Sequence, residues 1–208
     1  LIPNPDNYVN AMSVPYFNTF DNYDGDYDGE SYLPKGWIST GVYPLFTANI
    51  NGLDAVTGEY YLVAAESDID KRNERLYTPL FRLSNENEYV ISYYLYMPGN
   101  SGGGVLRATD LTVTVGTEQS INYHPVVKQT IEDQSISEWA YQEFTFKPQL
   151  SGAYCFAFSL NTEVNYSGMV AIEDFKITAP GLVENPIADF AIGGNFNVID
   201  SRMVVYKD

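Results

Sequence analysis

The sequence lacks most of the residues that build disulfide frameworks and common catalytic sites. It has one cysteine, Cys155, and one histidine, His124. One cysteine excludes an intrachain disulfide, and the clusters of His and Cys that bind zinc are missing. The apolar stretch around Cys155 favours a small buried core residue over an activated thiol. With His124 as the only candidate imidazole base and no G-x-S-x-G turn, we expect neither Cys–His nor Ser–His–Asp chemistry.

Basic residues are also scarce. The 11 Lys and Arg residues stand against 27 Asp and Glu residues, which gives a net charge of −16. Nucleic acids and anionic membrane surfaces are bound by basic patches, so neither is an expected partner. No run approaches the ~20 apolar residues of a membrane span, so we expect no membrane insertion. No signal peptide is visible in the opening LIPNPDNY, so an export signal would already have been removed.

Helical periodicity is missing as well. Short apolar runs recur between Gly, Pro, Asn and Asp, and the 18 tyrosines suit pleated, half-buried surfaces. Strands are expected over 14–20, 44–50, 59–65, 76–83, 88–97, 110–116, 125–131, 138–146, 152–160 and 169–178. This pattern predicts an all-β fold, namely an antiparallel sandwich.

A connector rich in Pro and Gly, APGLVENP (179–186), follows the last of these strands. Such segments often mark the end of a compact unit. We therefore expect one domain over 1–180. The remainder, 181–208, is interpreted as a connector plus a short β extension, either a hairpin or the start of a further module.

Carboxylates are abundant in one short stretch, DNYDGDYDGE (21–30). Five of them fall there: Asp21, Asp24, Asp26, Asp28 and Glu30. Asp alternating with glycine turns supplies the oxygen ligands that calcium takes. The spacing matches the first half of an EF-hand loop, but Lys35 occupies the twelfth position, where a bidentate Glu is needed, and no helix flanks the loop. Two interpretations stay open: a calcium loop on another scaffold, or a solvated acidic loop.

A second acidic pair, Glu173 and Asp174, lies within the last expected strand of the domain. Neighbouring residues of a strand point to opposite faces, so at most one of the two points toward the core. A buried carboxylate is costly unless it is paired or bound to a metal. If this strand returns beside the N-terminal segment, Glu173 or Asp174 completes a cation site with the 21–30 loop. The alternative is that both lie in water at a strand end.

The sequence also contains a partial hydrolase motif and two tryptophans. Laminarinase-type jelly-roll hydrolases carry a Glu-x-Asp-x-x-Glu strand, and the nearest match begins at Glu66. There Lys71 replaces the second glutamate, the acid/base, so we expect no enzyme. Trp37 and Trp139 could stack on sugar rings, although most aromatic residues of a sheet are structural.

The order of the sequence motifs along the chain resembles that of a known family. The motifs are TFDNYDGDYDGE…KGW (19–37), NERLYTPLFRL (73–83), EYVISYYLYM (88–97), SEWAYQEFTF (137–146), SGAYCFAFSLN (151–161) and MVAIEDFKIT (169–178). Together they resemble the cleaved-adhesin and choice-of-anchor J family of bacterial surface proteins, which is related in shape to MAM domains. That family has an Asp/Gly calcium loop before a Trp, an L-x-T-P-x-L strand and a closing I-D-D-x-x-I strand. Glu173 stands in place of the first Asp of the closing motif.

The resemblance implies a jelly-roll β-sandwich of the galactose-binding-like or MAM-like type. It implies structural calcium, for which the candidate ligands are Asp21, Asp24, Asp26, Asp28, Glu173 and Asp174. It also implies a secreted or cell-surface location, with a host or dietary glycan or an extracellular protein as partner. The leading hypothesis is therefore a non-enzymatic module for adhesion or carbohydrate binding. A structural accessory domain of a larger surface protein and a carbohydrate-active enzyme are the alternatives.

Overall fold

The computed structural model describes residues 1–21, 33–41, 46–48, 52–64, 73–98, 110–132, 135–161, 169–179, 196–199 and 202–205. Within these ranges the chain forms β-strands and two short 3₁₀ turns, η1 (Pro5–Tyr8) and η3 (Ile121–Tyr123). The expected all-β fold is confirmed. The helices of the described ranges are too short to cross a membrane.

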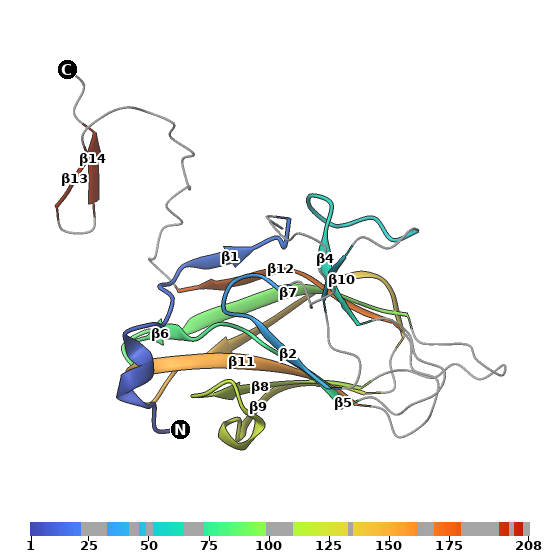
Figure 1. Cartoon of the computed structure of the whole chain (residues 1–208), viewed down its shortest axis with the longest axis horizontal. Coiled ribbons are helices and arrows are strands. Elements are labelled where there is room, and N and C mark those ends of the chain that lie inside the picture. Colours follow the sequence, from blue (N-terminus) through green and yellow to red (C-terminus); the bar gives the residue numbers. More distant parts are fainter. Residues whose placement is uncertain are drawn as a thin grey trace.

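Two sheets stack as the layers of a sandwich (Figure 1), and all of their strand pairs are antiparallel. The first, the β7 sheet, runs β10-β7-β12-β4-β3, and β1 also pairs with β12. Its strands are β1 (Tyr16–Asn18), β3 (Phe46–Ala48), β4 (Tyr61–Ala64), β7 (Tyr89–Met97), β10 (Ile136–Phe146) and β12 (Val170–Thr178). The second, the β11 sheet, runs β2-β5-β11-β8-β9, and β6 also pairs with β11. Its strands are β2 (Ile38–Thr40), β5 (Asn73–Tyr77), β6 (Phe81–Leu83), β8 (Asp110–Gly116), β9 (Val126–Ile131) and β11 (Gly152–Asn161).

One expected strand, 76–83, is in fact two. Thr78, Pro79 and Leu80 separate β5 from β6, because proline has no N–H to give to a ladder. The Thr78 hydroxyl takes over part of the pairing, since its Oγ1 accepts a hydrogen bond from Phe156 N at 3.0 Å. The Thr78 N–H donates to the Phe156 carbonyl at 2.9 Å. The chain therefore stays beside β11 through the break.

The core between the sheets is built from aromatic rings. Phe175 lies at its centre, with its ring centroid 5.2–6.4 Å from those of five others: Tyr16, Trp37, Phe81, Phe156 and Phe158. Four of these contacts are edge-on or tilted and the one with Phe81 is stacked, and edge-on contacts suit the charge distribution of aromatic rings. Alternation within β7 places Tyr89, Ile91, Tyr93, Leu95 and Met97 in this core. The other face of the β7 sheet carries a second, smaller cluster, in which Leu53 and Ala55 pack against Tyr61, Val63 and Ala171.

The N-terminal segment joins both layers. Met12 exchanges backbone hydrogen bonds with Leu80 and Arg82 beside β6, at 2.7 and 2.8 Å. A few residues later β1 pairs with β12, where Tyr16 lies opposite Ile177. The expected return of the closing strand to the N-terminal segment is thus confirmed (Figure 1).

The final strands are β13 (Phe196–Ile199) and β14 (Arg202–Val205), which pair with each other as a two-stranded antiparallel sheet. In the described part of the chain they share no ladder with the sandwich. This pairing fits both alternatives, a hairpin and the start of a further module, and the domain boundary near 180 stays a prediction.

Candidate functional site

Three carboxylates hold one loop over the outer face of the β7 sheet. We call Asp21, Glu173 and Asp174 the acidic site, and residues 52–60, which lead into β4, the Gly58 loop. Oδ1 of Asp21 accepts hydrogen bonds from the N–H groups of Glu59 and Tyr60 at 2.6 and 3.0 Å. Asp174 accepts one from the Thr57 hydroxyl at 2.7 Å. The acidic site therefore fixes the loop from the end of β1 and from β12 together.

Glu173 is the buried member of the acidic site, with 0% of its surface exposed. Its two oxygens accept hydrogen bonds from the N–H groups of Val56 and Thr57, at 2.6 and 2.7 Å. Burial raises the pKa of Glu173 to about 7, the two N–H donors lower it, and the nearby charges of Asp174 and Asp21 raise it. The pKa of Asp174 is raised mainly by burial and further by the charge of Asp21. Nearby positive charge would favour the ionised form of both carboxyls.

A β-bulge explains why two consecutive residues reach the same loop. The register of β12 against β7 shifts between Glu173 and Lys176, and Asp174 has a φ of +51°. Asp is among the few side chains that tolerate this left-handed region. The sequence analysis expected Glu173 and Asp174 to point to opposite faces. That expectation was wrong, because the bulge breaks the alternation.

Asp21 reaches the loop through a second left-handed residue. Phe20, which is buried, has a φ of +65°, and its N–H donates to Oδ1 of Asn18 at 2.8 Å. This turn directs Asp21 toward Gly58, which has a φ of +66° and no room for a Cβ against the Asp21 carboxylate. Residues held in such sparsely populated backbone regions tend to gather at functional sites.

The donor chemistry of the acidic site fits calcium. All of its candidate ligand atoms are carboxylate oxygens, which hard cations prefer. Glu173 would also gain from a cation, because it is buried beside two like charges. Among the described residues, however, no group of three acidic, His or Cys side chains is close enough to hold a metal alone. The remaining expected ligands, Asp24, Asp26 and Asp28, lie outside the described residues, as does Glu30.

The two tryptophans lie in different parts of the sandwich, Trp37 in the core and Trp139 on the outer face of the β7 sheet. Trp37 is only 5% exposed, and its Nε1 donates to the Tyr16 hydroxyl at 3.1 Å within the core. Trp37 therefore belongs to the structural aromatic residues of the core and offers no face to a ligand. Trp139 lies on the outer face of the β7 sheet, where its Nε1 donates to the Asp54 carbonyl at 2.7 Å. Trp139 thus also contacts the Gly58 loop, at Asp54.

An aromatic surface continues from Trp139 across the outer face of the β7 sheet. We give this name to Tyr94, Tyr96, Trp139 and Tyr141. The Tyr94 and Tyr141 rings meet edge to face at 5.5 Å, and the Tyr96 and Trp139 rings lie 5.8 Å apart. The sequence alternates in this strand, which leaves Tyr94 and Tyr96 on the face opposite the core residues. The signal was the tyrosine repeat on that face.

Strand register joins the aromatic surface to the acidic site. Tyr94 lies opposite Tyr141 on one side and opposite Glu173 on the other, so the three form one row across β10, β7 and β12. Tyr141 is 55% exposed, and its hydroxyl donates to Glu143 at 2.7 Å. The ring is therefore both accessible to solvent and fixed by a neighbouring carboxylate.

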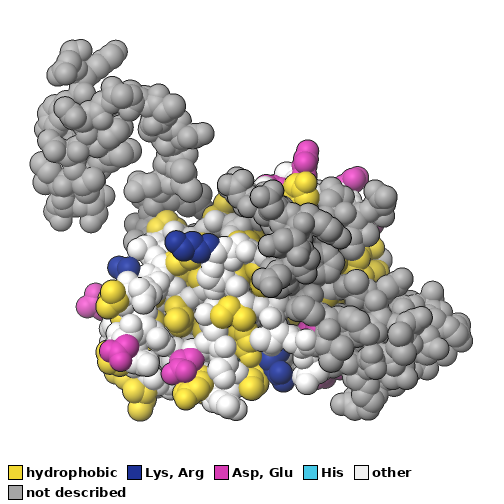
Figure 2. Space-filling model, viewed as in Figure 1, with side chains coloured by type: hydrophobic (Ala, Val, Ile, Leu, Met, Phe, Trp, Pro, Cys, Tyr) yellow, Lys and Arg dark blue, Asp and Glu magenta, His cyan; other side chains and the backbone are white. Residues whose placement is uncertain are grey.

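The charge of the surface matches that of the sequence. On the face shown in Figure 2, Lys and Arg side chains of the described residues are few and scattered. The acidic site and Glu143 add negative charge around the aromatic surface.

Comparison with solved structures identifies the fold. The chain is similar to the K1 cleaved adhesin domain of Lys-gingipain from Porphyromonas gingivalis W83, with a TM-score of 0.58 and 12% identity over 81% of this chain and 99% of that one. The K3 cleaved adhesin domain of the same protein gives 0.52 and 10% identity, over 78% and 96%. A carbohydrate-binding module, TmCBM61, solved in complex with β-1,4-galactotriose, gives 0.50 and 14% identity, over 70% and 89%.

These likenesses confirm the antiparallel jelly-roll sandwich and the cleaved-adhesin-like fold. At such low identity they show the fold alone. No protein-family model matches the sequence. No curated protein matches it either.

Proposed function

We propose that this domain is a non-enzymatic, exported module that binds carbohydrate through the aromatic surface, next to a structural calcium site. The row Glu173–Tyr94–Tyr141 is the observation that carries the proposal. It places an exposed, fixed tyrosine ring beside a loop that is anchored by carboxylates. Tyrosine offers an apolar face for a sugar ring and a hydroxyl for its polar groups, at a low cost in side-chain entropy.

Calcium has an indirect role in this proposal. The cation would bind at the acidic site together with carboxylates of the 21–30 loop. It would neutralise the charge that accumulates around Glu173 and hold the Gly58 loop in place. Trp139 donates to the carbonyl of Asp54 in that loop, so a well-ordered loop would also hold Trp139 and the aromatic surface in place. Glycan binding should therefore weaken when calcium is removed.

A hydrolytic role has less support. A glycosidase needs two carboxyl groups that face a substrate, either about 5–5.5 Å or about 6.5–9.5 Å apart. Glu173 is fully buried, and both of its oxygens accept hydrogen bonds from backbone N–H groups. The segment with the partial hydrolase motif, which includes Glu66 and Lys71, lies outside the described residues. We expect no turnover of aryl glycosides or polysaccharides.

A glycan array at a fixed millimolar calcium concentration tests the proposal. Tyr141→Ala should abolish binding of the glycans that the unmodified protein captures. Tyr123→Ala removes a comparably exposed tyrosine from η3 and should leave binding unchanged. Absence of any captured glycan, or equal losses in the two variants, would contradict the aromatic surface as the binding site. The same array in the presence of a chelator tests whether glycan binding depends on calcium.

A further inference from the structure

A second exposed aromatic ring, that of Phe17, lies on the same face of the β7 sheet as the aromatic surface. Phe17 belongs to β1, where it lies opposite Lys176 of β12. The preceding residue, Tyr16, packs against the core, so the alternation of a strand directs Phe17 to the outer face. Phe17 is 54% exposed and belongs to neither of the two apolar clusters among the described residues. Its ring is therefore accessible to a ligand.

One row of paired residues joins Phe17 to the strand that carries Tyr141. Phe17 lies opposite Lys176, which lies opposite Ser92. Ser92 in turn lies opposite Glu143 on β10. The row thus crosses β1, β12, β7 and β10, of which the first three lie side by side in Figure 1. Because Glu143 accepts the hydrogen bond of the Tyr141 hydroxyl, the row ends beside Tyr141.

The two exposed rings are too far apart for one sugar to contact both. β1 is separated from β10 by β12 and β7, which makes three steps from strand to strand. Neighbouring strands lie about 4.8 Å apart, so Phe17 and Tyr141 are roughly 15 Å apart across the sheet. A single pyranose ring is much shorter than this span, whereas several linked sugars cover it. A glycan that contacts both rings must therefore be an oligosaccharide.

Polar groups lie between the two rings. Glu143 is exposed, and a carboxylate keeps acceptor capacity beyond the one hydrogen bond from Tyr141. Lys176 carries an ammonium group, which is a donor. Sugar hydroxyls both donate and accept hydrogen bonds, while the C–H face of a sugar ring packs on an aromatic side chain. Two exposed rings with a donor and an acceptor between them therefore match a chain of linked sugars better than a continuous apolar surface.

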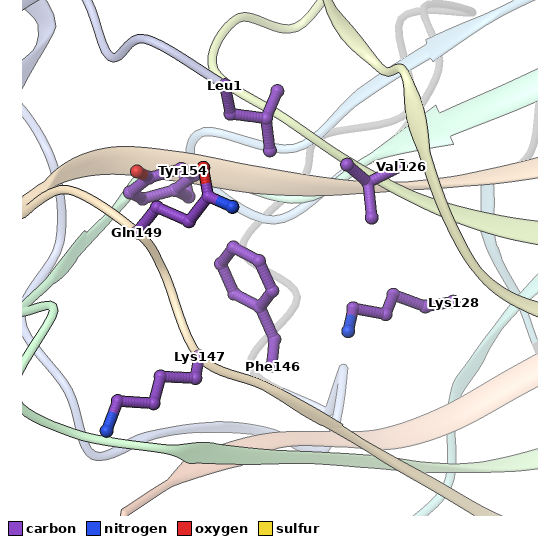
Figure 3. A pocket seen from close by; sticks show the side chains of 7 residues that line it. All are labelled: Leu1, Val126, Lys128, Phe146, Lys147, Gln149 and Tyr154. Carbon is purple, nitrogen blue, oxygen red and sulfur yellow. The ribbon is translucent and has the colours of Figure 1, made fainter.

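A pocket elsewhere in the sandwich offers no comparable ring. It lies where β9 and β10 meet the start of β11, has a volume of about 200 Å³, and is lined in part by Phe146 and Tyr154 (Figure 3). Both of these residues are buried in the core, so neither presents a face to a sugar. Phe146 and Tyr141 share β10, but only Tyr141 is exposed. The accessible rings therefore favour the outer face of the β7 sheet over this pocket.

We propose that the binding surface extends across the sheet to Phe17 and takes a linear oligosaccharide. One sugar unit would lie against Tyr141 and another, several units along the chain, against Phe17, with hydroxyls of the intervening units bound by Glu143 and Lys176. Affinity would then depend on chain length, because a disaccharide reaches only one of the two rings. The inference rests on the proposed carbohydrate-binding function, to which it adds the length of the ligand and the residue that detects it.

Isothermal titration with β-1,4-linked gluco-, manno- and xylo-oligosaccharides tests the inference, because this linkage gives extended chains. In each series the disaccharide is compared with the hexasaccharide at a fixed millimolar calcium concentration. In at least one series the unmodified protein should bind the hexasaccharide about tenfold more tightly, as a second aromatic contact commonly contributes. Phe17→Ala should remove this gain and leave disaccharide binding unchanged, whereas Tyr141→Ala should weaken the binding of both lengths.

Two further variants serve as controls. Tyr123→Ala removes a comparably exposed aromatic ring from η3 and should change the affinity for neither length. Phe17→Leu keeps an apolar side chain on β1 without the ring, so it decides the question if Phe17→Ala fails to fold. A hexasaccharide gain that survives in Phe17→Leu would overturn the inference, as would equal affinities for the two lengths or no heat with any of the three series.

The glycan array distinguishes this outcome from failure of the proposed function. Array binding that is lost in Tyr141→Ala, together with a hexasaccharide gain that Phe17→Leu retains, would leave carbohydrate binding in place and refute only the role of Phe17. An array on which the unmodified protein captures no glycan, together with no heat in the titrations, would refute both.

Discussion

The carboxylate of Asp21 occupies the space that a side chain at position 58 would need. A Cβ built on Gly58 would overlap both oxygens of Asp21, and Gly58 also has a φ of +66°. Glycine is therefore required at this position for two reasons, the left-handed backbone conformation and the close approach of the carboxylate. Asp21 and Gly58 together fix how the Gly58 loop lies against β1.

Gly58→Ala should destabilise the domain by about 2 kcal/mol or more, from left-handed strain plus displacement of Asp21. Urea unfolding measures the loss. Gly52→Ala is the matched control, because Gly52 has a φ of +95° but no atom within 4 Å of its Cβ position. The control should lose about 1 kcal/mol from backbone strain alone. Equal losses would show that Asp21 moves aside freely.

Calcium should raise the melting temperature, because a ligand that binds only the folded state stabilises it by mass action. The free energy of unfolding should rise by about 2.7 kcal/mol when the free calcium concentration is a hundredfold above Kd. Asp24→Ala combined with Asp26→Ala should abolish the increase, and Asp174→Asn should reduce it. Differential scanning fluorimetry with and without a chelator measures this effect. An unchanged melting curve would refute the calcium site.

Glu173→Gln should cost about 1–3 kcal/mol in chelator, because each carboxylate oxygen accepts from one N–H and the substitution turns one of these acceptors into an NH₂ donor. One N–H, of Val56 or Thr57, would then face the NH₂ group of the glutamine. Glu132→Gln, at an exposed position, controls for the loss of charge and should be nearly neutral. Similar unfolding free energies for the two variants would mean that the loop does not depend on Glu173.

His124 should make stability fall in mild acid. Burial lowers the pKa of His124, and the carbonyl of Glu118 and the Thr114 hydroxyl bond its ring nitrogens at 2.8 and 3.2 Å. The unfolded chain binds this proton below its ordinary pKa of about 6.5, whereas the folded chain binds it only at lower pH, so stability drops as pH falls through that value. The neighbouring Tyr77 and Cys155 have raised pKa values and do not titrate there.

Unfolding free energies at pH 7 and pH 5 measure this dependence. As pH falls from 7 to 5, the stability advantage of the unmodified protein over His124→Gln should shrink, because only the histidine gains a proton on unfolding. A constant difference would show that His124 is protonated without penalty in the fold.

Deletion of residues 181–208 should cost little stability. In the described residues β13 and β14 pair only with each other, and an isolated two-stranded hairpin is marginal in water. The main unfolding transition of the sandwich should remain. Loss of the whole transition would mean that the last strands belong to the core.

The strands were predictable wherever apolar runs end at turn residues. The range 110–116 was expected and agrees with β8, and β7 begins one residue later than expected. β2 was missed because three residues, Ile38–Thr40, are too few to show alternation. The split at Pro79 was overlooked, although proline inside a strand pattern argues against a continuous ladder.

The site was predictable only in part. Carboxylate density pointed to Asp21, Glu173 and Asp174, and sandwich topology suggested that β12 returns beside the N-terminal segment. The Gly58 loop gave no signal except a glycine, because its role depends on N–H groups that every residue has. Trp37 could not be told from Trp139, since burial of an aromatic residue is decided by which face of the sheet closes over it.

The pairing of β1 with β12 also sets an order for folding. Tyr16 emerges early in synthesis, yet its partner Ile177 follows almost the whole sandwich. β1 must wait unpaired until β12 is made, and such long-range pairings slow folding. The strand is only three residues long, and short edge strands limit wrong associations. Because Asp21 lies just beyond β1, the acidic site is completed last, and a cation would bind only a chain that has already closed.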